Sequence, residues 1–256
     1  MKKILSIIIC LFIISTIANA FAETKLITYE ELTNYGQLFE SDGNKGTEPI
    51  RIEAVIGRMK TETDSSFPDT YIDLWIKGEN GYGYMDKEIM GVMKKETSFP
   101  HELVSGQRVI YELTPYVDGS FSAASITSYE IIEEGVDYEA IEEQYKATNY
   151  EQVSYKKLLR NIDDYKGKPI CAEGIYLQEA NSESSYIDGL LMDDDGNIYC
   201  FVFLPERLQS RILLNDRLKV YGHIAKKQPT YKYLSLTGNR EVPQIWVDFI
   251  DILEEE

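Results

Sequence analysis

The stretch PICAEGIY at residues 169–176 decides the fold, because it repeats the pattern of PIRIEAVI at residues 49–56. Both stretches begin with proline and place a glutamate, Glu173 or Glu53, at the same position. Their side chains alternate in character with a period of two, which predicts a β-strand that turns one face to a core. One strand pattern therefore occurs twice, and the repeat can be followed in both directions from it.

Upstream of each strand lies a helix start. The first is TYEEL at residues 28–32 and the second is SYKKL at residues 154–158. Thr28 or Ser154 supplies a hydroxyl that can cap the first turn, and Glu31 completes a capping box with Thr28. Each unit is therefore predicted to open with a helix.

Downstream, a second strand begins with the same triplet, Tyr71-Ile72-Asp73 in one unit and Tyr186-Ile187-Asp188 in the other. Asn80-Gly81 and Asp195-Gly196 follow at the same spacing, and both dipeptides favour tight hairpin turns. A strand, a turn and a returning strand are therefore predicted in each unit.

The remainder of each unit follows one order: a stretch with helical spacing, a strand, and a last strand. These segments are residues 86–96, 108–113 and 125–132 in the first unit, and 205–213, 217–223 and 244–253 in the second.

Three strands, a short helix and two more strands form the element order of an OB barrel. We therefore predict a mainly β protein with two tandem five-stranded OB-fold-like barrels, each with a leading helix, at residues 25–132 and 153–253. The alternatives are an SH3-like barrel or a small sandwich.

Residues 133–152 join the two units and carry seven acidic residues and one lysine. Tyr138, Ile141 and Tyr145 follow helical spacing, so this segment is predicted to be an acidic helical connector. Residues 254–256 form an acidic tail.

Residues 1–22 have the pattern of a secretory signal peptide, with Lys2-Lys3, an apolar stretch and small residues. Cleavage is expected after Ala20 or Ala22. An uncleaved anchor is the alternative, although the apolar stretch is shorter than the ~20 residues that a membrane span needs. The expected product is an exported protein, secreted or associated with the cell envelope, with no integral membrane span.

The second unit resembles the tRNA-anti-like OB domains of Gram-positive bacteria, which include the C-terminal domain of the clostridial toxin-operon negative regulator. The residues that carry the resemblance are SYKKLLRN at 154–161, DYKGKP at 164–169, Glu173-Gly174, Leu177-Gln178, Cys200, Tyr231, Gly238-Asn239 and Pro243. The resemblance covers about 100 residues and implies an OB fold outside the cytoplasm with a binding or regulatory role. It supplies no catalytic residue.

The chain lacks the sequence signatures of several enzyme classes. It has two histidines, His101 and His223, and neither a zinc motif, a phosphate-binding loop nor a nucleophile elbow occurs. Asp193-Asp194-Asp195-Gly196 invites a calcium interpretation, but its spacing is not that of an EF-hand, and a hairpin turn explains it. We therefore predict no catalytic residue, metal or cofactor, and a non-enzymatic protein.

Two cysteines, Cys171 and Cys200, follow the signal peptide. Strand alternation places Cys171 with Glu173 on a solvent face, and Cys200 with Ile198 and Val202 on a core face. Side chains on opposite faces of a sheet cannot form a disulfide, so both thiols are predicted to be free.

Charge distinguishes the two units. The chain has 43 acidic and 26 basic residues, a net charge of -17, which disfavours unspecific binding of polyanions by the whole protein. Residues 25–132 hold 18 acids and 10 bases, whereas residues 153–253 hold 14 and 13. Within the second unit, residues 217–240 contain six lysines and arginines and no acid.

This basic span would form strand 4 of an OB barrel, the following loop and the start of strand 5, beside the usual ligand face. Aromatic residues on the third strand could stack a ligand there, unless they are core residues. The candidate ligand-binding residues are Tyr199, Phe201, Phe203, Lys226, Lys227, Tyr231, Lys232, Tyr233 and Arg240.

The sequence therefore predicts an exported binding module whose second barrel recognises an anionic ligand. An oligonucleotide, a cell-surface polymer and an acidic peptide all fit. The alternative is a protein-interaction or assembly module of the cell envelope that uses the acidic first unit and the connector.

Overall fold

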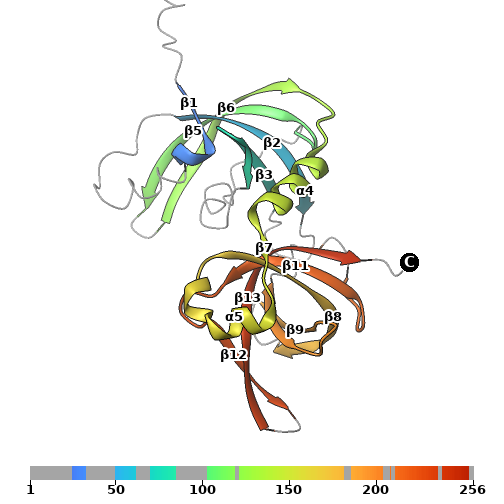
Figure 1. Cartoon of the computed structure of the whole chain (residues 1–256). Coiled ribbons are helices and arrows are strands. Elements are labelled where there is room, and N and C mark those ends of the chain that lie inside the picture. The colour runs from blue at the N-terminus through green and yellow to red at the C-terminus, as the bar shows by residue number, and fades with distance from the viewer. Residues whose placement is uncertain are drawn as a thin grey trace, which may run out of the picture. The chain divides into compact units, whose positions relative to one another are not determined.

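The computed structural model describes residues 25–32, 50–61, 70–84, 103–118, 121–181, 186–203, 208, 211–235 and 238–253 (Figure 1). The chain divides into two compact units, residues 1–141 and 142–256. The division falls within helix α4, Tyr138–Asn149. The signal peptide and the acidic tail predicted from the sequence lie outside the described residues.

The first unit is one antiparallel sheet with the strand order β4-β3-β2-β5-β6. A short strand, β1, pairs in parallel with β2 at its edge. Its strands are β1 Leu26–Ile27, β2 Ile50–Thr61, β3 Thr70–Gly78, β4 Gly81–Tyr84, β5 Arg108–Asp118 and β6 Phe121–Glu133. One face of the sheet forms a core that includes Ile52, Leu74, Ile76, Val109 and Tyr111.

The second unit has the same strand order and adds a strand. After α4 come β7 Glu151–Gln152, α5 Tyr155–Arg160, the 3-10 helix η1 Ile162–Tyr165, β8 Pro169–Asn181, β9 Ile187–Met192, β10 Ile198–Phe203, β11 Arg217–Ile224, β12 Thr230–Ser235 and β13 Gly238–Leu253.

Five strands of the second unit pair in a ring. β8 lies between β9 and β11, β9 pairs with β10, and β11 pairs with β13. A parallel ladder from β10 to β13, with Cys200 opposite Gln244, completes the ring. This is the pairing of an OB barrel, in which the third and fifth strands run in parallel. The protein is therefore mainly β with an OB-like fold, as predicted.

The helix cap predicted for the first unit is confirmed. The backbone nitrogen of Thr28 donates to Glu31 Oε2 at 3.1 Å, and the backbone nitrogen of Glu31 donates to Thr28 Oγ1 at 3.3 Å. In the second unit Ser154 occupies the N-cap position with extended backbone, but its hydroxyl makes no capping hydrogen bond. The expected hydroxyl cap is thus wrong there.

Both predicted hairpins form. In the first, Gly78 pairs with Gly81, so the turn is Glu79-Asn80, one residue earlier than predicted, and Gly81 has a positive φ of 132°. In the second, Asp193 Oδ1 accepts hydrogen bonds from the backbone nitrogens of Asp195 and Asn197, at 3.1 and 2.8 Å. The Asp193 carboxylate thus holds the turn.

The helical stretches predicted after the hairpins have different outcomes. Residues 86–96 lie outside the described residues. Of residues 205–213, the described ones, Leu208 and 211–213, do not form a helix. The last strand, β13, begins at Gly238 rather than Gln244, because its first half pairs with β12, a strand that the sequence did not predict. In Figure 1, β12 and the start of β13 project from the barrel as a two-stranded ribbon.

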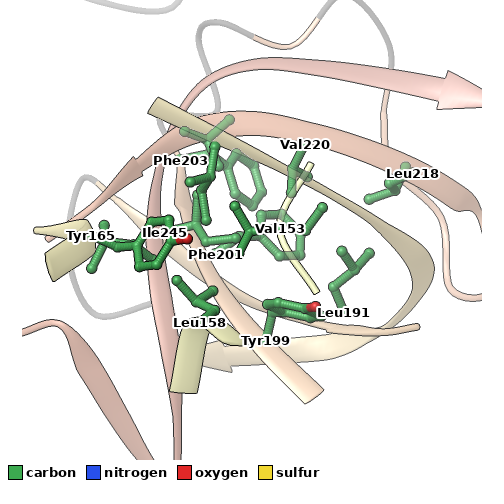
Figure 2. Close-up of a cluster of buried hydrophobic side chains, with 14 of the residues drawn as sticks. Val153, Leu158, Tyr165, Leu191, Tyr199, Phe201, Phe203, Leu218, Val220 and Ile245 are labelled. Atoms are coloured by element: carbon green, nitrogen blue, oxygen red, sulfur yellow. The ribbon is translucent and has the colours of Figure 1, made fainter. Parts of the chain in front are cut away.

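The interior of the second barrel is filled by apolar side chains from every strand of the ring. Figure 2 shows Phe201 and Phe203 of β10, Val220 of β11 and Ile245 of β13 gathered with Leu158 of α5. The leading helix therefore contributes directly to the barrel core, since Leu158 is fully buried.

The predicted connector helix forms as α4, and Tyr138, Ile141 and Tyr145 are half-buried. Its most buried side chains, however, are charged: Glu142 and Lys146. Lys146 Nζ lies 2.7 Å from Glu142 Oε1 and 2.6 Å from Asp251 Oδ1 on β13. Although burial lowers the pKa of Lys146, hydrogen bonds to Asp251 and Glu142 raise it above the usual value.

Aromatic rings surround this buried lysine. Lys146 Nζ lies 5.2 Å from the ring centroid of Tyr221 and 5.6 Å from that of Phe249, distances typical of cation–π contacts. Tyr150 also packs edge-on against both rings. The end of α4 is therefore part of the second unit. None of the helices among the described residues is long and apolar enough to cross a membrane.

Candidate ligand-binding face of the second barrel

The ligand face of an OB barrel is centred on the outer surface of its second and third strands and is bordered by the loop after the fourth. In the second unit these strands are β9 and β10, and that loop follows β11. Side chains of β10 alternate between the barrel interior and this outer surface. The structure therefore decides which set of β10 residues lies on the candidate face.

The predicted stacking residues do not lie on it. Tyr199, Phe201 and Phe203 are 4%, 0% and 5% exposed and belong to the barrel core (Figure 2). The rings of Phe201 and Phe203 stack with centroids 5.4 Å apart. Gly189 of β9 leaves room for the Phe201 ring, because a Cβ there would lie 2.5 Å from it. These three residues fill the barrel, so their predicted role as stacking platforms is wrong.

The opposite side of β10 is also apolar. Cys200 and Val202 point outward and are buried in a second hydrophobic cluster with Leu190 of β9 and Val242 of β13. Partly buried residues surround this cluster: Leu177, Tyr186, Ile198, Tyr231 and Trp246. The ribbon of β12 and β13 contributes Tyr231 and Val242, so it covers part of the face.

Three aromatic side chains form the rim of this cluster, and all three are partly exposed. The rings of Tyr186 and Trp246 lie with centroids 5.2 Å apart at an interplanar angle of 66°. Tyr231 is packed against the same cluster from β12. We call Tyr186, Tyr231 and Trp246 the aromatic rim. Of these, only Tyr231 was a predicted ligand-binding residue.

A carboxylate, Asp188, lies within the candidate face. It stands opposite Val202 in the β9–β10 ladder, on the same strand face as Leu190, and two residues after Tyr186, which precedes β9. Burial raises its pKa. Its charge acts on both Cys200 and Tyr231, raising the pKa of each beyond the effect of burial. Among the residues that the structure describes, Asp188 has no hydrogen bond or ion pair.

Lys226 and Lys227 border the face in the loop between β11 and β12, and both are exposed. Two backbone hydrogen bonds with Gln244 anchor this loop. The nitrogen of Ala225 donates to the oxygen of Gln244 at 3.3 Å, and the nitrogen of Gln244 donates to the oxygen of Pro229 at 2.9 Å. Gln244 is also the partner of Cys200 in the β10–β13 ladder, so the loop is tied to the candidate face. No carboxylate of the described chain pairs with either lysine.

The remaining predicted residues lie on the projecting ribbon. Lys232 is exposed and pairs with Glu241 at 3.1 Å, and Tyr233 stands opposite Arg240 in the β12–β13 ladder. The side chain of Tyr233 lies outside the described residues. The structure therefore brings Tyr231 to the face and anchors the loop of Lys226 and Lys227 beside it, with the Lys226 side chain packed over Gly167, just before β8. A glutamate offsets the charge of Lys232.

The two cysteines are free, as predicted, but the predicted reason is wrong, because both are buried and Cys200 does not face the barrel core. Ile170 and Ala172 of β8 point into the barrel, so Cys171 points outward, as does Cys200. Cys200 stands opposite Leu190 of β9, and Leu190 stands opposite Gln178 of β8, seven residues from Cys171. The two thiols are therefore separated by two strand spacings across the sheet and by roughly 20 Å along β8. A disulfide cannot span that separation.

One carboxylate group within the described ranges has metal-ligand spacing: Glu142, Glu143 and Asp251. Lys146 Nζ already lies within 3.0 Å of an oxygen of each. The ammonium group of Lys146 provides the positive charge at the centre of this cluster. The cluster therefore stabilises the fold.

No protein-family model matches the sequence, and no curated protein matches it. Solved structures that are similar include the tetrameric p202 HIN2, at 8% identity and a TM-score of 0.36 over 82% of this chain and 95% of that chain. Another is a deletion mutant of the single-stranded DNA binding protein from Thermus aquaticus, at 8% identity and a TM-score of 0.24 over 81% of this chain and 95% of that chain. A third is a Replication Protein A heterotrimer bound to ssDNA, at 7% identity and a TM-score of 0.25 over 91% of this chain and 70% of that chain.

Proposed function

We propose that the second barrel is a non-enzymatic binding module for single-stranded nucleic acid. The bound strand would lie across the outer face of β9, β10 and β13. The observation that carries the proposal is the presence, in one barrel, of the aromatic rim and of Lys226 and Lys227, two exposed lysines that no described carboxylate neutralises. Bases stack on aromatic rings, and phosphates attract lysines, so a single strand uses both features.

The rim favours this ligand over the other anions that the sequence allowed. An acidic peptide or a charged envelope polymer can interact with the lysines without using the aromatic rim, whereas a single strand uses both features. The two loop lysines provide only a small electrostatic contribution, so the proposal requires that stacking supply most of the affinity. This agrees with the net charge of -17, which disfavours a purely electrostatic mode of binding.

The test is fluorescence anisotropy with the full chain and a labelled twelve-nucleotide single strand, over a series of salt concentrations. The charge variant K226E/K227E is expected to weaken binding and to reduce the slope of log K against log salt by about 1.4, at ~0.7 per phosphate contact. Tyr231→Leu preserves an apolar side chain but removes the ring. It is expected to weaken binding roughly tenfold with the salt slope unchanged, because stacking is not screened.

The matched control is K156E/R160E, which makes the same change of charge on exposed positions of α5. Its affinity is expected to fall less than that of the loop variant, and only through long-range repulsion. Equal losses in the two charge variants, or an unchanged affinity in Tyr231→Leu, would contradict the proposed site. A wild-type chain that binds no single strand would contradict the proposed function and would favour the protein-interaction alternative.

We also propose that the chain is exported after cleavage at Ala20 or Ala22, and that the second unit is related to the tRNA-anti-like OB domains that its sequence resembles. The lysine pair at residues 2–3 and the apolar stretch after it support export. Amino-terminal sequencing of the protein from the culture medium or the envelope tests this, with Phe21 or Glu23 expected first and Met1 the contrary result.

A further inference from the structure

Asp188 is an unusual residue for the centre of an apolar face. Its neighbours are Leu190 of β9, Tyr186 just before that strand, and Val202 across the ladder. Its charge also acts on Tyr231 and Cys200. Within the described chain, no cation and no hydrogen-bond donor compensates the carboxylate. A partly buried charge without a partner opposes folding, because it has lost part of its hydration and gained nothing in return.

The position of this carboxylate limits what can bind there. An ionised carboxylate only accepts hydrogen bonds, and it accepts two in parallel through its two oxygens. The rings beside it offer flat surfaces to a planar group. A ligand that satisfies both features is a stacked ring whose edge presents two adjacent N–H donors toward Asp188.

Among the common bases, guanine alone has that edge. Its N1–H and its N2 amino group lie side by side, whereas adenine and cytosine each present one amino group next to an acceptor, and thymine presents one N–H between two acceptors. Single-stranded bases are recognised on this edge, because it is not occupied by a pairing strand.

We infer that Asp188 makes the candidate face selective for guanine, by accepting hydrogen bonds from N1–H and N2–H of a base that stacks on the aromatic rim. The inference rests on the proposed function and adds specificity to it. Lys226 and Lys227 are then responsible for attraction of the phosphates, the rim for stacking, and Asp188 for the choice of base.

The test uses the full chain and eleven-nucleotide thymine strands that carry one variable base at the centre, so that guanine cannot form four-stranded assemblies. Wild-type protein is expected to bind the guanine strand roughly tenfold more tightly than the thymine, adenine and cytosine strands. Replacing guanine by hypoxanthine removes only the N2 amino group and is expected to abolish most of that preference.

Asp188→Asn is expected to lose the preference, since an amide has a single acceptor and places a donor against guanine, while it still binds the thymine strand. Asp195→Asn is the matched control, because it makes the same change of charge at an exposed position in the β9–β10 turn. It is expected to keep the preference for guanine.

The outcomes separate the two proposals. If no strand binds, the proposed function fails. If all strands bind wild-type protein equally, the function stands and the guanine inference fails. The guanine inference also fails if Asp188→Asn strengthens the binding of every strand by the same factor, because the carboxylate then only repels phosphate.

Discussion

Arg217 of β11 binds Glu173 of β8, with Nη2 2.8 Å from Oε1. The first unit contains the same pair at equivalent positions, since Arg108 Nη1 of β5 lies 3.1 Å from Glu53 Oε1 of β2. In both units the arginine is the first residue of its strand, β5 or β11, and the glutamate lies in the first half of the neighbouring strand, β2 or β8. The internal repeat therefore preserves a contact between distant residues as well as a sequence pattern.

The two pairs are expected to differ in strength. The Glu53 side chain is 10% exposed and that of Glu173 is 30% exposed, so loss of the arginine leaves a more buried carboxylate in the first unit. We expect Arg108→Ala to lower the free energy of unfolding by about 2 kcal/mol and Arg217→Ala to lower it by less. Urea denaturation of the full chain measures both. Lys25→Ala, which breaks an exposed pair with Glu31, serves as the control and should be nearly silent.

Lys146 is the charged side chain on which the docking of α4 depends most. Lys146→Met keeps the length of the side chain but leaves Glu142 and Asp251 without their partner, so we expect a loss of about 3 to 5 kcal/mol in unfolding free energy. Because the folded-state pKa of Lys146 is raised, its stabilising contribution is complete below the ordinary lysine value of about 10.4 and is lost as the pH rises beyond it. Lys157→Met, on an exposed pair, is the comparison; an equal effect in both variants would contradict the structure.

Cys171 and Cys200 are expected to react with a thiol reagent only after unfolding. Both are buried, and burial raises the pKa of each thiol, so the reactive thiolate is scarce in the native protein. For a chain produced from residue 23 onward, Ellman's reagent should label no thiol rapidly in buffer and two in denaturant without reductant. Labelling of fewer than two thiols in denaturant would indicate a disulfide.

Asp188 should oppose folding at neutral pH. Burial raises its folded-state pKa, so the folded protein binds a proton more tightly than the unfolded chain, and stability falls as the pH rises from the ordinary aspartate value of about 4. Asp188→Asn should therefore unfold at a higher temperature at pH 7, with a gain of about 0.5 to 1 kcal/mol because solvent screens part of the charge. Thermal melts at pH 7 and near pH 4 measure this, and a gain that persists unchanged at the lower pH would have another cause.

The succession of strands along the chain, apart from β12, could be predicted from the sequence because local signals and the repeat agreed. Alternation at residues 169–176 and the glycine-containing turns mark strands independently of tertiary structure. The capping box at Thr28 and Glu31 is also local, and it forms.

The ligand face could not be predicted, since it depends on which side of β10 points inward. Both sides are apolar: Tyr199, Phe201 and Phe203 alternate with Cys200 and Val202. The outward set is apolar because an unpredicted strand, β12, brings Tyr231 against it. Tyr186 and Asp188 stood in the repeated triplet, but alternation alone gave no reason to place them with Trp246. The burial of Lys146 could not be predicted either, because its partner Asp251 lies 105 residues away along the chain.

Strand β13 pairs with β11, β12 and β10, so three of the strand pairings in the second unit await one segment. Until residues 238–253 pair as β13, β10 and β11 expose unpaired edges and the core around Phe201 is open to water. Contacts between segments so far apart in sequence form slowly, because the intervening loop must first be closed. A chain interrupted before residue 238 therefore has unpaired strand edges and does not form a smaller barrel. The second unit is protected from aggregation only after residues 238–253 have been synthesised.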